Sequence, residues 1–191
     1  MQTLNLSRVT DEDRALVDKI AERAKVNLRD CYQCGKCSAG CPMAEDMDYT
    51  PQQVMHLLQM GLVDKALDAR GPWVCAQCMV CSARCPQNID IAAIMLEVRR
   101  ESNAQGRCVV RESEVFETAF LNGVRKNGIS NEQYLAAAFN FKSGHLMQDM
   151  DGAPKMLLKG LIGIKHHKRP DAAEVGELVK TCLDKKGGET R

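Results

Sequence analysis

The sequence is poor in aromatic residues and has no excess of charge of either sign. It contains one Trp, three Tyr and four Phe among 191 residues, so a core must come mainly from aliphatic side chains and the ten Met. The 26 basic and 25 acidic side chains nearly cancel, which argues against a nucleic acid or an anionic membrane as the main partner. The longest apolar runs, such as residues 91–96, are far shorter than a membrane span, so no membrane association is expected.

Motifs of several common enzyme classes are also missing. No Gly-x-Gly occurs, which argues against a dinucleotide-binding loop and hence against flavin or nicotinamide binding on this chain. No nucleophile elbow, zinc-protease helix or pair of adjacent cysteines is present. Residues 1–8 have neither the basic nor the apolar region of a secretory signal, so we expect a reducing, cytoplasmic location. The sequence offers no evident site for a substrate of its own.

What the sequence has in excess is cysteine, with ten in all and eight of them in two runs of one pattern. Each run spells C-x2-C-x2-C-x3-C-P: the first is Cys31, Cys34, Cys37, Cys41 and Pro42, and the second is Cys75, Cys78, Cys81, Cys85 and Pro86. Residues 31–42 and 75–86 agree at eight of twelve positions, because Gln33, Ser38 and Ala39 recur as Gln77, Ser82 and Ala83. The runs are therefore an internal repeat, which predicts the same local structure twice.

This spacing is typical of ligands to a cubane 4Fe-4S cluster. Three thiolates spaced three residues apart on one tight loop can each reach a different iron atom. In two-cluster ferredoxins with this pattern, the fourth cysteine of each run binds the other cluster. The expected ligands are Cys31, Cys34, Cys37 and Cys85 for cluster 1, and Cys75, Cys78, Cys81 and Cys41 for cluster 2. Because this exchange ties both runs together, we expect the domain to fold poorly without iron.

Two other uses of the cysteines are less suited to the pattern. Structural zinc usually takes two well-separated ligand pairs, whereas each run here places four cysteines within eleven residues. Disulfides need an oxidising compartment, for which the sequence gives no sign. Zinc is the main alternative to the two clusters.

Hydrophobic periodicity predicts an all-α protein. Helices are expected over residues 11–28, 51–61, 62–70, 91–105, 113–128, 131–139 and 153–164. Thr10, Asp90 and Asn131 are expected N-caps, and Thr50 with Gln53 forms a capping box. The alternating strand pattern of small bacterial ferredoxins is missing. We therefore predict an alpha-helical ferredoxin domain, residues 1–105, with both clusters between helices, and a helical C-terminal extension for subunit docking, residues 106–191, ending in a disordered tail.

Some residues near the runs differ between the two copies. Lys36 stands in the first run where the second has Val80, and a nearby cation favours a reduced cluster, so cluster 1 is predicted to have the higher potential. The alternative is that Lys36 points into solvent, where its charge is screened. Trp73 is expected to pack over cluster 2 as a solvent shield.

The remaining cysteines, histidines and basic residues are expected to be structural or solvent-exposed. Cys108 and Cys182 are interpreted as small buried hydrophobic residues. The basic stretch 155–169 is interpreted as a solvated face in preference to a docking patch. No role is assigned to the four histidines, His56, His145, His166 and His167.

The segments CYQCGKCSAGCP and PWVCAQCMVCSARCP resemble the C subunits of heterodisulfide reductase. The resemblance is strong over residues 28–105 and looser in the tail, where KMLLKG is similar to a basic helical segment of that family. It implies a protein with two 4Fe-4S clusters between a flavin-containing A subunit and a cysteine-rich catalytic B subunit. In methanogenic archaea the B subunit reduces the heterodisulfide of coenzyme M and coenzyme B. A hydrogenase or a formate dehydrogenase is a candidate upstream donor.

Similar cysteine loops occur in the iron-sulfur subunits of succinate dehydrogenase and of glycolate and glycerol-phosphate dehydrogenases, so other functions stay open. The chain could be a free-standing ferredoxin-like carrier, a relay subunit of a related complex in a sulfate reducer, or an iron-sulfur protein that senses redox state. The residues after 105 favour a built-in interface, because a diffusing carrier needs little beyond the cluster domain. We therefore expect a relay subunit that is not itself catalytic.

Overall fold

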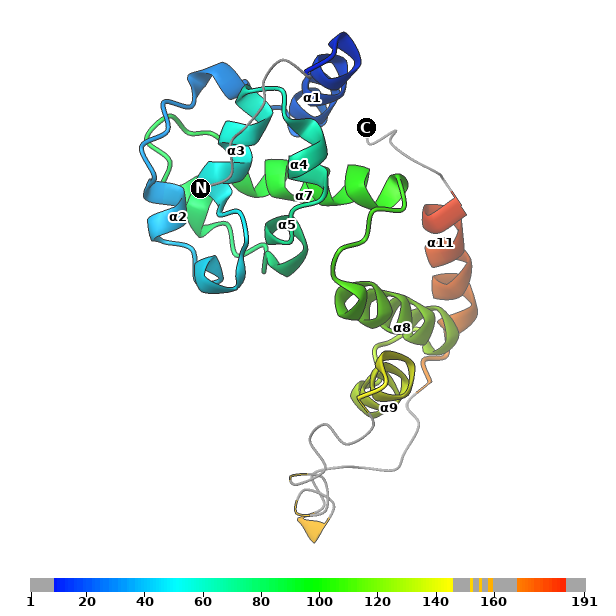
Figure 1. Ribbon diagram of the computed structural model, residues 1–191. Coiled ribbons are helices and arrows are strands. Elements are labelled where there is room, and N and C mark those ends of the chain that lie inside the picture. Colours follow the sequence, from blue (N-terminus) through cyan, green and yellow to red (C-terminus); the bar gives the residue numbers. More distant parts are fainter. Residues whose placement is uncertain (1–8, 146–151, 153–154, 156–157, 160–167, 185–191) are drawn as a thin grey trace. The chain divides into compact units, whose positions relative to one another are not determined.

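The computed structural model describes residues 9–145, 152, 155, 158–159 and 168–184. The chain forms two compact units, Met1–Val110 and Arg111–Arg191 (Figure 1). The division into a cluster domain and a docking extension after residue 105 stays a prediction, because compactness does not establish a separate role for either part. The predicted helix over residues 153–164 and the predicted disordered tail lie largely outside the described residues.

The described residues contain helices and no strand, which confirms the all-α prediction. In unit 1 the α-helices are α1 (Asp11–Arg23), α2 (Lys36–Ala39), α3 (Pro51–Gln59), α4 (Val63–Leu67), α5 (Gly71–Val74), α6 (Val80–Ala83) and α7 (Ile91–Ala104), with 3-10 turns η2 (Leu28–Asp30) and η3 (Ala44–Asp46). Unit 2 contains α8 (Arg111–Asn127), α9 (Glu132–Ser143) and α11 (Ala172–Asp184). No helix among the described residues is long and apolar enough to cross a membrane.

Local capping explains where the longer helices begin. The Thr10 hydroxyl accepts a hydrogen bond from the Asp13 amide (3.2 Å), and the Asp13 carboxylate accepts one from the Thr10 amide (2.8 Å), which completes a capping box at α1. The Thr50 amide donates to the Gln53 side chain (2.8 Å) at the start of α3, as predicted. The Asp90 carboxylate accepts from the Ala93 amide (3.1 Å) at α7. Each of these helix N-termini is set by residues within four positions of one another, so it can be predicted from the sequence.

The first helix is shorter than predicted. Periodicity favours a helix to residue 28, but α1 ends at Arg23 and Lys25 has a left-handed backbone with φ of 55°. The Asn27 side chain then accepts from the Arg29 amide (3.1 Å) and starts the turn η2, which leads into Cys31. The apolar residue Leu28 is buried, but it belongs to the turn η2 and not to α1. The helical prediction for residues 24–28 is therefore wrong.

The core of unit 1 is aliphatic and surrounds α7. Helices α1, α3, α4 and α5 pack against α7 (Figure 1). Helix α6 packs against it as well. The side chains most deeply buried include Ile20, Val54, Met55, Leu58, Val63, Leu67, Ile94, Met95 and Val98. This core is continuous with Cys37 and Cys81, the third cysteine of each run. The two cysteine loops are therefore anchored directly on the hydrophobic core.

Ion pairs tie α7 and the segment after it to the rest of unit 1. Glu101 on α7 is nearly buried and accepts a hydrogen bond from Arg23 at 3.0 Å, with Lys19 also nearby at 3.5 Å. Arg107 donates to the carboxylates of Asp68 (2.6 and 2.8 Å) and Asp64 (2.6 Å). These contacts hold α1 and α4 against α7, the helix that follows the second cysteine run.

Unit 2 is a small helical assembly in which α8 packs against both α9 and α11. Phe116 and Phe139 meet edge to face with ring centroids 6.0 Å apart. Helix α8 begins two residues before the predicted start, and α9 extends four residues beyond the predicted end at 139. Helix α11 was not predicted. Its Gly176 lies where a Cβ would come within 2.8 Å of the Arg125 carbonyl, so glycine permits close packing on α8.

Candidate metal centre

The sequence repeat is a repeat of backbone conformation. Gln33 and Gln77 have φ of 62° and 52°, and Gly35 and Met79 have φ of 79° and 61°. Two left-handed residues therefore flank the second cysteine of each run. Departures of this kind turn successive amide groups toward one side and form concave anion-binding nests, which are common at iron-sulfur sites. The loops have the backbone form that a thiolate-bound cluster requires.

The recurring serines fix each loop to the helix that follows it. The Ser38 hydroxyl in α2 accepts from the Gln52 amide (3.0 Å) in the first turn of α3. The Ser82 hydroxyl in α6 accepts from the Ala92 amide (3.0 Å) in the first turn of α7. Ser82 also donates to the Asp90 carboxylate at 2.7 Å. Each serine thus accepts a hydrogen bond from an amide in the first turn of the next helix, where backbone amides have no partner within the helix.

The recurring glutamines lie beside the first cysteine of each run. The Gln33 side-chain amide nitrogen lies 3.5 Å from the Cys31 sulfur, and the Gln77 nitrogen lies 3.5 Å from the Cys75 sulfur. Gln33 also donates to the Gln59 side chain (2.7 Å), which in turn donates to the Leu28 carbonyl (2.8 Å). Hydrogen bonds to sulfur help to set the potential of an iron-sulfur cluster, and each glutamine is placed to make one to a predicted ligand.

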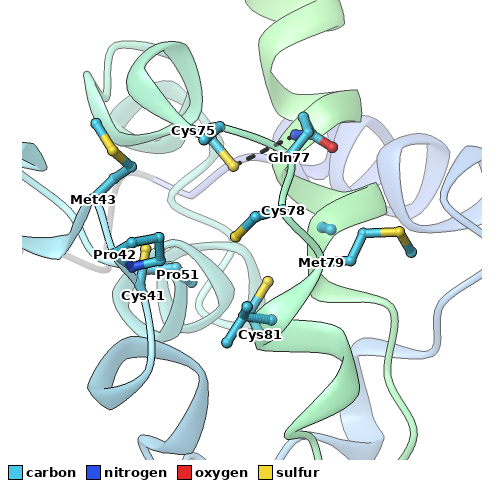
Figure 2. Close-up of a pocket in the computed structure, with 12 residues that line it drawn as sticks. Cys41, Pro42, Met43, Pro51, Cys75, Gln77, Cys78, Met79 and Cys81 are labelled. Carbon is cyan, nitrogen blue, oxygen red and sulfur yellow. Dashed lines mark hydrogen bonds between the residues drawn. The ribbon is translucent and has the colours of Figure 1, made fainter.

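Four cysteines from both runs line one pocket. Figure 2 shows the sulfur atoms of Cys75, Cys78 and Cys81 facing a common opening together with that of Cys41, which comes from the first run. Pro42, Met43 and Pro51 form an apolar wall, and the side chain of Met79 points away from the sulfurs. The structure therefore brings together the four residues predicted as ligands of cluster 2.

Cysteines of both runs also lie near Tyr32. Tyr32 is 58% exposed, and its hydroxyl pKa is raised above its ordinary value by partial desolvation and by the neighbouring Cys34 and Cys85. Cys34 of the first run and Cys85 of the second, both predicted ligands of cluster 1, therefore lie near the same side chain.

Burial affects the protonation of three cysteines in the two runs. Burial raises the pKa of the Cys37 and Cys75 thiols above the ordinary value and raises that of Cys81 to about 11. In the metal-free protein these thiols are therefore neutral near pH 7, and metal binding must release their protons. Cys34 and Cys78 are exposed, so each set of four reaches the surface at its second cysteine.

The donor set fits an iron-sulfur cluster. Tetrahedral zinc needs four sulfurs about 2.3 Å from one point. A cubane instead takes one thiolate on each of four separate irons. Sulfur-only donors, an apolar wall and a backbone nest suit that geometry.

Other residues singled out in the sequence occupy varied positions. Lys36 is exposed, whereas Trp73 is 3% exposed. Cys108 is half-buried with its sulfur 3.4 Å from the Val110 carbonyl, but Cys182 is exposed, so its assignment as a buried hydrophobic residue is wrong. His56 and His145 are exposed, and His166 and His167 lie outside the described residues. The described basic residues of the stretch 155–169, Lys155, Lys159, Lys168 and Arg169, are exposed.

Sequence reasoning missed two features of this site. The roles of Ser38 and Ser82 were signalled by their recurrence at matching positions of the repeat. Arg99 was not signalled, because it reaches the site from the middle of α7. Its guanidinium carbon lies 5.2 Å from the centroid of the Trp73 ring, close to the second run.

Comparison with known proteins agrees with this site. Residues 27–89 match the family model of the 4Fe-4S dicluster domain. These residues include all eight cysteines of the two runs.

Relatives of the chain are C subunits of heterodisulfide reductases. The iron-sulfur C subunit of the CoB–CoM heterodisulfide reductase of Methanopyrus kandleri is 32% identical over 97 residues, 50% of this chain and 50% of that protein. The C subunit of the H2:CoB–CoM heterodisulfide, ferredoxin reductase of Methanothermobacter thermautotrophicus is 28% identical over 53% of this chain and 55% of that protein. A protein of Archaeoglobus profundus that is like the heterodisulfide reductase C subunit is 30% identical over 51% of this chain and 55% of that protein. The chain thus spans about half the length of the curated relatives it matches, and the resemblance to C subunits is confirmed over that part.

Proposed function

We propose that this chain holds two 4Fe-4S clusters through exchanged cysteine ligands and relays single electrons within a heterodisulfide reductase complex. Cluster 1 is bound by Cys31, Cys34, Cys37 and Cys85, and cluster 2 by Cys75, Cys78, Cys81 and Cys41. The observation that carries the proposal is the pocket in which Cys41 joins three cysteines of the other run (Figure 2). When bound, the clusters supply one-electron redox chemistry.

The surrounding residues suit an electron relay. Cys34 and Cys78 are exposed, so a redox partner can approach each set of ligands closely. Cys37 and Cys81, the third cysteine of each run, are both buried. Helices α2 and α6, which carry them, pack together. The chain therefore offers two separate points of access joined through its own core.

The chemistry that this chain lacks must come from partners. The proposed partners are a flavin-containing A subunit and a cysteine-rich catalytic B subunit that reduces the heterodisulfide of coenzyme M and coenzyme B. The names of the relatives support this assignment, since they are C subunits of enzymes acting on that heterodisulfide. A hydrogenase or a formate dehydrogenase is proposed as the upstream donor. The location proposed for the complex is the cytoplasm, where thiols stay reduced.

Anaerobic native purification tests this function. We expect about eight irons per chain, as two cubanes require, together with co-eluting flavin and cysteine-rich subunits. A Cys108→Ser variant is the matched control, because Cys108 lies outside both runs, and it should retain the full iron content. Eight irons on a chain that elutes alone would instead indicate a mobile carrier, and two zincs per chain would overturn the cluster assignment.

A further inference from the structure

A cation is held beside the second cysteine run by an aromatic side chain. The guanidinium carbon of Arg99 lies 5.2 Å from the centroid of the Trp73 ring, within the range of a cation-π contact. Trp73 lies in α5 and is 3% exposed, and Cys75 follows it by two residues. Because α5 packs against α7, the position of Arg99 on α7 is fixed relative to the start of the run.

Arg99 lies near a predicted ligand. Its guanidinium contacts the Trp73 ring, and Cys75, a predicted ligand of cluster 2, follows Trp73 by two residues. Arg99 is itself half-buried. The cation therefore lies near the start of the second run in a partly buried environment.

We propose that Arg99, positioned by Trp73, is a cation that stabilises the reduced form of cluster 2 and raises its midpoint potential. The proposal rests on the proposed cluster assignment. Reduction adds one electron to the cluster, supplied by the redox partner, and no covalent bond or proton is exchanged. The added negative charge spreads over the cluster and its four thiolates, where a neighbouring cation stabilises it.

Burial makes the charge of Arg99 more effective at a nearby cluster than the charge of Lys36, the cation that the sequence singles out. Lys36 is exposed, so solvent and salt screen its charge, whereas Arg99 is partly covered and screened less. A guanidinium also keeps its proton across the physiological pH range, so its effect does not depend on pH. We therefore expect the larger electrostatic contribution at cluster 2 and not at cluster 1.

The test is a redox titration of the full iron-loaded chain, with dithionite as reductant and electron paramagnetic resonance as the readout. In Arg99→Gln we expect one of the two midpoint potentials to fall while the other is unchanged. The shifted step should be the one lost in a Cys78→Ala variant. Arg99→Lys keeps the charge and should retain most of the wild-type potential, which a purely structural role of the guanidinium would not explain.

Arg100→Gln is the matched control, because Arg100 is the next residue on α7 and its exposed side chain pairs with Glu97. It should leave both potentials unchanged. Two unshifted potentials in fully loaded Arg99→Gln, or equal shifts of both, would overturn the proposal. If Arg99→Gln loses iron, Trp73→Leu decides: losing the cation-π contact that positions Arg99 should lower the same potential, and an unchanged value would overturn the proposal. Iron content and both signals in the wild type test the cluster assignment separately.

Discussion

The two cysteine runs share one backbone and one set of fixed contacts, yet their surroundings differ. Gln33 and Gln77 contact the first cysteine of each run at the same distance. The first run has a glycine at its second left-handed position, whereas the second run places Met79 there. The repeat therefore preserves what holds the ligands in place and varies what surrounds them, which is how one fold can give two centres different potentials.

The largest expected effect concerns the exchange of the fourth cysteines. If Cys41 belongs with Cys78, the double variant Cys41→Ala/Cys78→Ala damages a single centre and should retain about four irons per chain. The double variant Cys34→Ala/Cys41→Ala damages both centres and should retain little iron. The two proteins differ only in which second cysteine is removed, and both of these cysteines are exposed.

Iron and sulfide analysis after anaerobic reconstitution measures this difference directly. The opposite pattern, with more iron in Cys34→Ala/Cys41→Ala, would mean that each run binds its own cluster. That result would contradict the ligand assignment while leaving the number of clusters intact.

The sequence revealed those parts of the site that depend on short-range patterns. The cysteine spacing and the capping boxes at Thr10 and Thr50 each span only a few residues, so the sequence displays them directly. The sequence does not show features that depend on contacts between residues far apart in the chain. The early end of α1 reflects the turn into Cys31, and the exposure of Cys182 depends on the packing of α11 against α8.

Two features near the site, at Arg99 and Met79, could likewise not be predicted from the local sequence. The contact of Arg99 with Trp73 joins two helices, and no local pattern in α7 marks it. The left-handed conformation of Met79 could be inferred only from its alignment with Gly35 in the repeat, because a methionine does not itself favour positive φ.

A second difference between the runs is the strength of the serine contact. Ser82 accepts from the Ala92 amide and also donates to the Asp90 carboxylate, which caps the same helix. Ser38 accepts from the Gln52 amide at the start of α3. We expect Ser82→Ala to lower the free energy of unfolding by about 2 kcal/mol and Ser38→Ala by about 1 kcal/mol, as for N-cap losses.

Thermal unfolding of the iron-loaded variants, followed by circular dichroism under anaerobic conditions, compares the two. Each variant is the control for the other, since the same hydroxyl is removed from equivalent positions of the repeat. Equal losses would show that the additional bond to Asp90 adds nothing to stability.

The smallest expected effect comes from the left-handed positions themselves. Gly35 has φ of 79°, and no atom lies within 4 Å of the place where its Cβ would stand, so Gly35→Ala adds backbone strain of about 1 kcal/mol, part of which the stiffer unfolded chain offsets. Met79 already bears such strain at φ of 61° and points away from the sulfurs (Figure 2). Met79→Gly should relieve that strain, but the freer unfolded chain offsets part of the gain, which leaves a stabilisation of about 0.5 kcal/mol. Thermal unfolding of the iron-loaded proteins should therefore move in opposite directions for the two substitutions. A loss of stability in Met79→Gly would mean that the 54% exposed Met79 side chain makes a contact that stabilises the fold by more than the backbone strain costs. Met79 would then have a packing role in the second run that Gly35 does not have in the first.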